Sequence, residues 1–214
     1  MTLDPTSETT RTYDHIASNY AARWQERGIL AAQIARFMTL IPAGGLVCDV
    51  GCGPGFDTAV LRQHGFRAIG LDRSLGMMQA GREVHGPTLP FVQMDMRALP
   101  LAKTAVCGLW ASASLLHLLR QDMLPALCGF ARVLKPGGVL YLSLKAGAEA
   151  DWQPNPYQNE GLRFFTYWQP ETLDPLLIQA GFHIVDGWLD QSKRTHWLVR
   201  YAQLADHLPN QLTD

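Results

Sequence analysis

The stretch that decides the fold is Leu46-Val47-Cys48-Asp49-Val50-Gly51-Cys52-Gly53-Pro54-Gly55-Phe56-Asp57-Thr58. Its apolar start predicts a buried strand, because a parallel strand covered on both faces needs no polar alternation. Glycines then stand at every second position, and the residues from Phe56 to Leu61 predict a helix with Asp57 in its first turn, where the helix dipole favours an acid. A strand, a glycine-rich turn and a helix together indicate the first unit of a nucleotide-binding α/β fold.

The spacing of the glycines restricts which ligand the turn can hold. A dinucleotide-binding turn needs Gly-x-Gly-x-x-Gly, and Phe56 occupies the third glycine position. A P-loop ends in Gly-Lys-Ser/Thr, and no lysine lies between Gly44 and Arg62. Asp57 at the helix start would also repel a polyphosphate. The turn therefore either binds an adenosine-type cofactor without phosphates or only lets the strand and the helix pack closely.

The composition describes one globular domain without an obvious polyanionic partner. The 214 residues are 47% hydrophobic and carry 18 basic and 19 acidic side chains, for a net charge of −1. This balance gives no reason to expect nucleic acid or an anionic membrane as a partner. The chain shows no basic and apolar leader and no run of about 18 apolar residues, so we expect a cytoplasmic protein without a transmembrane helix. A monomer and a homodimer are both open.

The four cysteines are expected to be small buried hydrophobic residues in a reducing compartment. They are Cys48, Cys52, Cys107 and Cys128. Cys48 and Cys52 have no neighbouring histidine or second cysteine pair that would complete a metal site, so we expect no metal.

Strands and helices alternate after the glycine turn. Further strands are expected at 67–71, 89–94, 105–110 and 139–144, with helices at 74–80 and 121–134 and a turn at 135–138. This alternation predicts a parallel doubly wound sheet. Before the first strand, residues 1–10 are expected to be frayed, and helices are expected at 11–27 and 29–40 with a break at Gly28.

Residues 147–170 interrupt the alternation with Pro154, Pro156 and six aromatic side chains, and we expect an insertion or lid there. A helix over 170–180 and strands over 182–189 and 195–204 follow, and pairing these strands would give the sheet an antiparallel edge. We therefore expect a single domain, with a helical cap (1–42), a cofactor-binding core (43–146), the lid (147–170) and a C-terminal helix with two strands (171–214).

Acidic residues stand on or at the ends of three expected strands. Asp72 ends the second strand 17 positions after Gly55, a spacing that suits a carboxylate accepting hydrogen bonds from ribose hydroxyls. Asp95 ends the third strand and could accept from an adenine amino group, with Met96 packed on the ring. Asp49 could fix the glycine turn or meet an ammonium group of the cofactor. The alternative for each is a structural turn or cap residue, but three acids together suit a cofactor with cationic groups better than one with pyrophosphate.

Four motifs resemble those of the class I S-adenosylmethionine-dependent methyltransferases, in the order and spacing of that family. They are Asp49-x-Gly51-x-Gly53-x-Gly55, Gly70-Leu71-Asp72-Arg73-Ser74 with Met77, Asp95-Met96-Arg97-Ala98-Leu99-Pro100, and Arg132-Val133-Leu134-Lys135-Pro136-Gly137-Gly138. The small-molecule branch is the most similar, and the chain resembles the ubiquinone-biosynthesis C-methyltransferases over residues 13–145, with a weaker likeness to residue 182. The opening Tyr13-Asp14-x-x-Ala17-x-x-Tyr20 also resembles this branch.

The resemblance implies a Rossmann-like class I fold, S-adenosylmethionine as cofactor and a small-molecule methyl acceptor. The positions that it assigns to the cofactor are Tyr20, Asp49, Gly51, Cys52, Gly53, Asp72, Arg73, Met77, Asp95, Met96 and Ala111. For Tyr13 and Tyr20 the alternative is packing on a helix face. The fourth strand ends in Leu109-Trp110-Ala111-Ser112-Ala113-Ser114 and lacks the Asn/Asp-Pro-Pro-Tyr/Phe motif of enzymes that methylate exocyclic amines of nucleic acid bases or glutamine amides.

Methyl transfer from a sulfonium needs a general base only if the acceptor holds a proton at neutral pH. His117 follows the fourth strand and is the candidate base, and the alternative is a histidine that packs or caps the next helix. The aromatic residues of the lid favour an aromatic or amphipathic acceptor, and Arg163 could hold a carboxylate. The same rings could instead form a core within the lid.

Three other functions are compatible with parts of the pattern. A dinucleotide oxidoreductase is disfavoured by Phe56 and by the acids at the strand ends. A non-catalytic S-adenosylmethionine-binding protein would retain Asp72 and Asp95 as well. A tRNA or protein methyltransferase on the same fold would need a surface patch that sequence does not reveal.

Overall fold

The computed structural model describes residues 4–25, 30–157, 161–191 and 195–206. Its main sheet has seven strands in the order β3-β2-β1-β4-β5-β9-β8. The pairs among β1 to β5 are parallel, whereas β9 runs antiparallel to both β5 and β8. The strands are β1 (Leu46–Val50), β2 (Arg67–Asp72), β3 (Phe91–Gln93), β4 (Val106–Ser112), β5 (Leu134–Lys145), β8 (Phe182–Asp190) and β9 (Trp197–Leu204). The predicted doubly wound sheet with an antiparallel C-terminal strand is confirmed.

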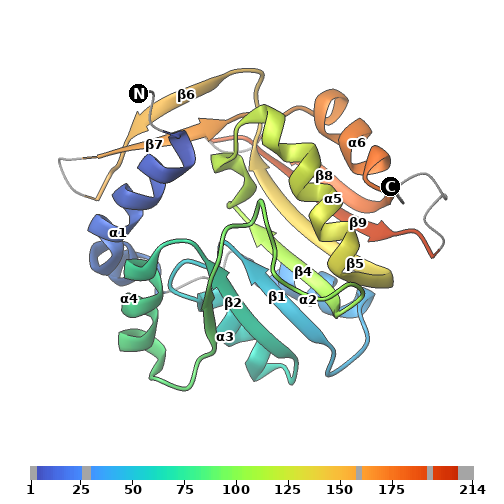
Figure 1. Ribbon diagram of the computed structural model, residues 1–214, viewed down its shortest axis with the longest axis horizontal. Coiled ribbons are helices and arrows are strands. Elements are labelled where there is room, and N and C mark those ends of the chain that lie inside the picture. Colours follow the sequence, from blue (N-terminus) through green and yellow to red (C-terminus); the bar gives the residue numbers. More distant parts are fainter. Residues whose placement is uncertain (1–3, 26–29, 158–160, 192–194, 207–214) are drawn as a thin grey trace.

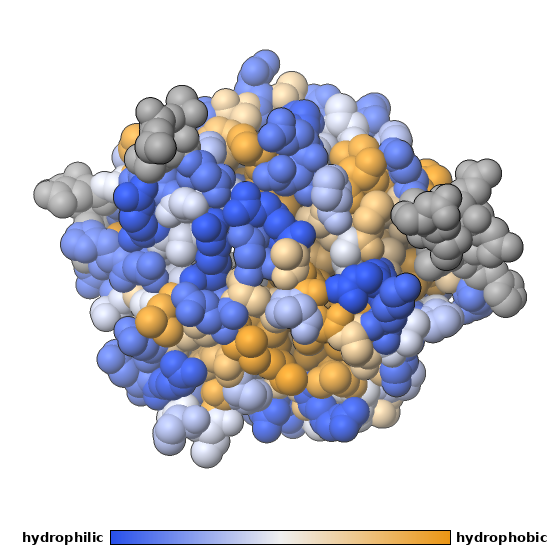
Figure 2. All heavy atoms as spheres, viewed as in Figure 1, coloured by the Kyte–Doolittle hydropathy of each residue, from blue (hydrophilic) through white to orange (hydrophobic). Residues whose placement is uncertain are grey.

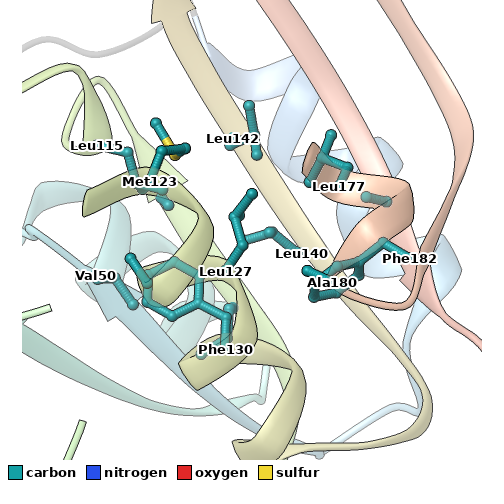
Figure 3. Close-up of a cluster of buried hydrophobic side chains, with 14 of the residues drawn as sticks. Val50, Leu115, Met123, Leu127, Phe130, Leu140, Leu142, Leu177, Ala180 and Phe182 are labelled. Carbon is teal, nitrogen blue, oxygen red and sulfur yellow. The ribbon is translucent and has the colours of Figure 1, made fainter. Parts of the chain in front are cut away.

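Helices cover both faces of the sheet, because every second side chain of a central strand points to the same face. On one face, α5 (Met123–Val133) and α6 (Pro170–Gln179) pack on the strands, and Figure 3 shows Leu127 of α5 and Leu177 of α6 beside Leu140 of β5. On the other face, α2 (Ala31–Leu40) and α3 (Phe56–Gln63) pack against a second cluster that contains Trp110 and Tyr141. The rings of Trp110 and Tyr141 are stacked with centroids 3.8 Å apart.

The first helix, α1 (Pro5–Arg23), lies beside α4 (Leu75–His85), as Figure 1 shows. Asp14 of α1 accepts hydrogen bonds from Ser74 Oγ at 2.6 Å and from Gly76 N at 2.8 Å, so it ties α1 to the start of α4. The prediction that residues 1–10 are frayed is wrong from Pro5 onward. Asp4 is the N-cap of α1 and accepts from Thr6 N at 3.2 Å, and a proline suits the first helical position because it lacks an N–H.

The predicted insertion is a two-stranded antiparallel hairpin of β6 (Ala150–Pro154) and β7 (Leu162–Thr166). Its second strand is fixed to α1, because Thr9 Oγ1 accepts from Phe164 N at 2.9 Å and Thr12 Oγ1 donates to Leu162 O at 2.7 Å. Figure 1 shows this hairpin crossing the same end of the molecule as α1. The hairpin and α1 thus form one cover over the carboxyl ends of the strands.

Two other boundaries differ from the sequence prediction. The expected turn at 135–138 is part of β5, where the register to β4 shifts between Val106 and Gly108 and Gly137 has φ +70°. Strand β3 ends at Gln93, so Asp95 lies in the loop that follows it. The expected break at Gly28 lies outside the described residues. None of the helices in the described part of the chain combines the length and apolarity that a membrane crossing needs.

Candidate functional site

The glycine turn after β1 is packed closely on one side and open on the other. Gly51 has φ +70°, and a Cβ there would lie 2.3 Å from Cβ of Ser114, so no larger residue fits without displacing the loop after β4. Gly53 has φ +54°, and nothing lies within 4 Å of the position of its Cβ. The backbone is held from β2, since Gly51 N and Cys52 N donate to Leu71 O at 2.7 and 3.1 Å. Gly51 therefore allows close packing of the turn, while Gly53 leaves room beside the backbone.

The Asp72 carboxylate holds the loops on both sides of it. Its Oδ2 accepts from Gly53 N at 2.7 Å, and its Oδ1 accepts from Ser74 N at 2.8 Å. Burial and the nearby charge of Asp14 raise the pKa of Asp72, whereas the backbone hydrogen bonds to its carboxylate lower it; burial is the largest of these causes, and the pKa lies above its usual value. Because the oxygens of a carboxylate offer about four acceptor sites, two backbone bonds leave capacity for a ligand hydroxyl. The structural alternative for Asp72 is met, and its ribose role stays a prediction.

Asp95 is engaged by arginines rather than free. Arg97 donates from Nε to both carboxylate oxygens at 3.1 Å and from Nη2 to Oδ2 at 2.7 Å, and its backbone N donates to Oδ1 at 2.9 Å. Burial acts to raise the pKa of Asp95, but these hydrogen bonds hold it below its usual value. Arg73 lies 3.7 Å from the same carboxylate and donates to Ser7 Oγ of α1 at 2.9 Å. In Figure 2, hydrophilic residues gather near the middle of the face, in the region that Figure 1 shows between α1 and the strand ends.

Two further acids lie deeper, Asp49 on β1 and Asp57 in the first turn of α3. Asp49 is 2% exposed, and its Oδ2 accepts from Thr58 Oγ1 at 2.6 Å. Asp57, 5% exposed, accepts from Trp110 Nε1 at 2.9 Å. Asp49 thus fixes the turn to α3, which is one of its two expected roles.

These residues line one narrow cavity of about 100 Å³, which α1 closes with Thr6, Thr9 and Tyr13. All but one of the positions assigned to the cofactor by sequence line it, namely Tyr20, Asp49, Gly51, Cys52, Gly53, Asp72, Arg73, Met77, Asp95 and Met96. The exception is Ala111, which is fully buried among the residues of β4. Because β4 continues to Ser112, the cavity is instead lined by Ser112, Ala113 and Ser114.

A second and larger cavity, of about 570 Å³, adjoins the first. The two share five lining residues, which are Tyr13, Tyr20, Ser112, Ala113 and His117. Strands β5, β8 and β9 supply Tyr141, Ser143, Trp188, Trp197 and Val199, while α1, α2 and the hairpin supply the other walls. From the hairpin region, Tyr157 and Phe165 line the cavity, whereas Phe164 and Trp168 are buried as core. Some rings of the insertion thus line the larger cavity and others pack in the core, and their role toward an acceptor stays a prediction.

His117 lies where the two cavities meet, and both of its ring nitrogens are engaged. Nδ1 is 2.6 Å from Phe164 O, which can only accept, so Nδ1 carries the proton and Nε2 accepts from Tyr13 Oη at 2.9 Å. The pKa of His117 is lowered to about 3, chiefly by burial. The charges of Arg163 and Lys145 act in the same direction, and the hydrogen bond to Phe164 O acts in the opposite one. A neutral imidazole whose lone pair is occupied is a poor general base, so the geometry favours a structural role for His117.

Comparison with known proteins shows what the part of the chain around this cavity is similar to. The family model described as "Methyltransferase domain" matches residues 47–138, which contain the glycine turn and the acids of the first three strands. Residues 47–138 form a methyltransferase domain of the class I S-adenosylmethionine-dependent family. The cofactor of this family is S-adenosylmethionine, and the acid-lined cavity with its open glycine suits the cationic sulfonium and ammonium groups of that molecule.

Named relatives of the chain show the range of this family. An O-methyltransferase, cnsE, of Penicillium expansum is 32% identical over 159 residues, 69% of this chain and 55% of its own. Trans-aconitate 2-methyltransferase of Paracidovorax citrulli is 40% identical over 108 residues, 49% of this chain and 40% of its own. The chain thus spans about half of these relatives or less. The 1,6-didemethyltoxoflavin-N1-methyltransferase of Burkholderia thailandensis shares the fold, with 21% identity, a TM-score of 0.71 and coverage of 96% of this chain and 92% of its own.

The sequence did not point to two features of this site. Lys145 lines the larger cavity at the carboxyl end of β5, and the rule that was applied to the acids at strand ends would have found it. The contact of Tyr13 with His117 joins positions 104 apart, and no local pattern signals it. Within the described residues, no group of three or more His, Cys, Asp or Glu side chains could hold a metal ion.

Proposed function

We propose that this chain transfers the methyl group of S-adenosylmethionine to a small molecule bound in the larger cavity. The observation that carries the proposal is the junction of the two cavities, whose shared lining includes Tyr13, Tyr20 and His117. A donor in the acid-lined cavity and an acceptor in the aromatic one would meet there. Methyl transfer requires this proximity, because the sulfonium is already activated and most of the rate can come from positioning.

In this proposal each side of the narrow cavity holds one part of the cofactor. Asp72 accepts from the ribose hydroxyls, and Met96 packs on the adenine ring near Asp95. The turn at Gly51 and Gly53 lies along the methionine part. Because Arg97 already occupies Asp95, the adenine amino group would share that carboxylate with the guanidinium.

The reaction itself is an in-line displacement at the methyl carbon. A bond forms between the acceptor atom and the methyl carbon while the carbon–sulfur bond breaks, and its electron pair goes to the sulfur. Since His117 is neutral and its Nε2 is occupied, we propose an acceptor that is already ionised at neutral pH. The acceptors in the relatives' names, trans-aconitate among them, are small molecules and favour this substrate class.

Calorimetric titration with S-adenosylmethionine, S-adenosylhomocysteine and NAD tests the cofactor assignment. Asp72→Asn keeps the shape of the side chain but replaces a charged acceptor, so we expect the first two ligands to bind about 10- to 100-fold more weakly. The matched control is Glu171→Gln, since Glu171 is exposed on α6, and it should leave both affinities unchanged. Binding of NAD, or equal affinities in Asp72→Asn and the parent chain, would contradict the proposed site.

The remaining alternatives separate in the same experiments. A non-catalytic binding protein would bind S-adenosylmethionine and never release S-adenosylhomocysteine in the presence of any acceptor. A tRNA methyltransferase would retain tRNA at low salt, where phosphate contacts are strongest. The cytoplasmic location stays a prediction.

A further inference from the structure

Two cationic side chains project into the larger cavity without an acidic partner. Arg163 of β7 and Lys145 at the end of β5 both line it. Lys145 Nζ is 3.5 Å from the centroid of the Phe165 ring, and Arg163 Cζ is 5.2 Å from the same centroid, so both charges lie near one aromatic ring. Burial, with Arg163 as the next cause, lowers the pKa of Lys145 to about 8.

The hydrogen bonds of the two cations leave their charge uncompensated. Within the described part of the chain neither forms an ion pair, and Lys145 Nζ donates to the neutral Gln153 Oε1 at 2.9 Å. Arg163 reaches Tyr13 Oη only at 3.4 Å, and its buried Nε has no hydrogen-bond partner among the described residues. A partly buried cation without an anion is costly, which indicates that an anion completes this group of residues.

The acids near this pair do not fill that place. Asp151 of β6 partly offsets the charge of Lys145, but its side chain is exposed and accepts from Tyr167 Oη at 3.1 Å. Asp190 also lines the cavity and has a partner of its own. Among the described residues, neither acid thus forms an ion pair with Arg163 or Lys145.

We propose that the acceptor is a carboxylic acid whose carboxylate binds between Arg163 and Lys145 and receives the methyl group as an ester. Planar guanidinium groups match the geometry of a carboxylate, and the surrounding rings, such as Tyr157 and Trp197, suit an apolar or aromatic remainder. The inference rests on the proposed function and names its substrate class.

The position of Arg163 places the anion at the point of transfer. Its Nη1 lies 3.4 Å from Tyr13 Oη, and Tyr13 lines both cavities, so a carboxylate on Arg163 lies beside their junction. One carboxylate oxygen is held by the cations while the other faces the sulfonium. An oxygen–carbon bond forms, the carbon–sulfur bond breaks toward sulfur, and no proton moves. This step needs no base, which agrees with the engaged and neutral His117.

Binding of simple carboxylates tests the anion site directly. The probes are benzoate, phenylacetate, cinnamate and malonate, with benzamide and phenylacetamide as neutral counterparts, titrated into the protein saturated with S-adenosylhomocysteine. We expect at least one carboxylate to bind about tenfold or more tightly than its amide. Arg163→Gln and Lys145→Gln should each remove about tenfold of that affinity, whereas Arg36→Gln, on the exposed surface of α2, should remove none.

Affinity for S-adenosylhomocysteine separates this inference from the proposed function. If Arg163→Gln also loses affinity for S-adenosylhomocysteine, Arg163→Lys is measured as well. Because Arg163→Lys keeps the positive charge, its affinities show whether the loss in Arg163→Gln comes from misfolding. Equal binding of carboxylates and amides, or carboxylate affinity that withstands both glutamine variants, overturns the anion site while the cofactor site stands. Failure of the parent chain to bind either sulfur compound overturns the proposed function instead.

The transfer step has its own readout. The carboxylate that binds most tightly is incubated with S-adenosylmethionine labelled in the methyl group. Because esters hydrolyse in base and ethers and methylamines do not, we expect label that base releases as methanol. Label that withstands base, or no label while the carboxylate is bound, overturns the carboxylate as methyl acceptor.

Discussion

Stability should fall between pH 7 and pH 5 because His117 is buried in its neutral form. Burial lowers its pKa in the folded state to about 3, from the ordinary value of 6.5. Below pH 6.5 the unfolded chain therefore binds a proton that the folded chain does not, and the stability is lost as the pH falls from 6.5 toward 3. At about 1.36 kcal/mol per pH unit, the free energy of unfolding loses about 2 kcal/mol between pH 7 and pH 5 through this one side chain.

Urea unfolding at pH 7, 6 and 5 measures this loss. In His117→Gln the amide can still donate to Phe164 O, but it cannot take up a proton. We therefore expect the variant to be less stable at pH 7 and to lose about 2 kcal/mol less than the parent chain on going to pH 5. His15→Gln is the matched control, because His15 is exposed on α1, and it should keep the pH dependence of the parent chain.

The imidazole signals in the NMR spectrum give an independent check. The signal that disappears in His117→Gln should not titrate between pH 5 and pH 8. A midpoint near 6.5 for that signal, or equal pH dependence of stability in the two chains, would refute the buried neutral state. It would also restore His117 as a candidate base, since the argument against that role depends on its low pKa and its engaged Nε2.

Two more outcomes follow from the site. Gly51→Ala should lower the free energy of unfolding by about 2 to 5 kcal/mol, because its Cβ would strain a left-handed backbone and also clash with the Cβ of Ser114 at 2.3 Å. Gly65→Ala, at φ +85° with open space around it, should lower it by only about 1 to 2 kcal/mol. Equal losses of the two variants in urea unfolding would contradict this. Benzoate affinity should fall by up to about tenfold between pH 7 and pH 9, because Lys145, with a pKa of about 8 beside Arg163 and Asp151, loses its charge in that window. Calorimetry should show a flat profile in Lys145→Gln, and an equally steep profile there would assign the titration to another group.

The sheet and the cavity that we assign to the cofactor were predictable because their signals are local. A buried parallel strand is continuously apolar, and the ligand of such a sheet lies beyond its carboxyl ends. Those two rules predict that Asp49, Asp72 and the glycine turn lie together at one edge of the sheet, and all three line one cavity. Ala111 itself does not line the cavity, whereas Ser112, Ala113 and Ser114 do, since the end of β4 depends on its pairing with β5 as far as Ser112; the role of the Ala111 carbonyl stays a prediction.

The acceptor side could not be predicted in the same way, because it is built from contacts between distant segments. Tyr13 of α1 meets His117 and Arg163, and the hairpin strand β7 is held by threonines of α1. Polar residues at the start of α1 suggested a frayed end, but tertiary hydrogen bonds outweigh that local preference. No periodicity in the sequence encodes which turn of α1 faces which strand of the hairpin.

The two cavities differ in charge, and this difference bears on turnover as well as binding. Acids such as Asp49 and Asp72 line the cavity assigned to the cofactor, while Lys145 and Arg163 line the one assigned to the acceptor. With a carboxylic acid as acceptor, each substrate carries the charge that its cavity attracts. Transfer then turns the sulfonium into a neutral thioether and the carboxylate into a neutral ester. Both products lose the attraction that held the substrates, so the same residues that bring the reactants together also favour the release of the products.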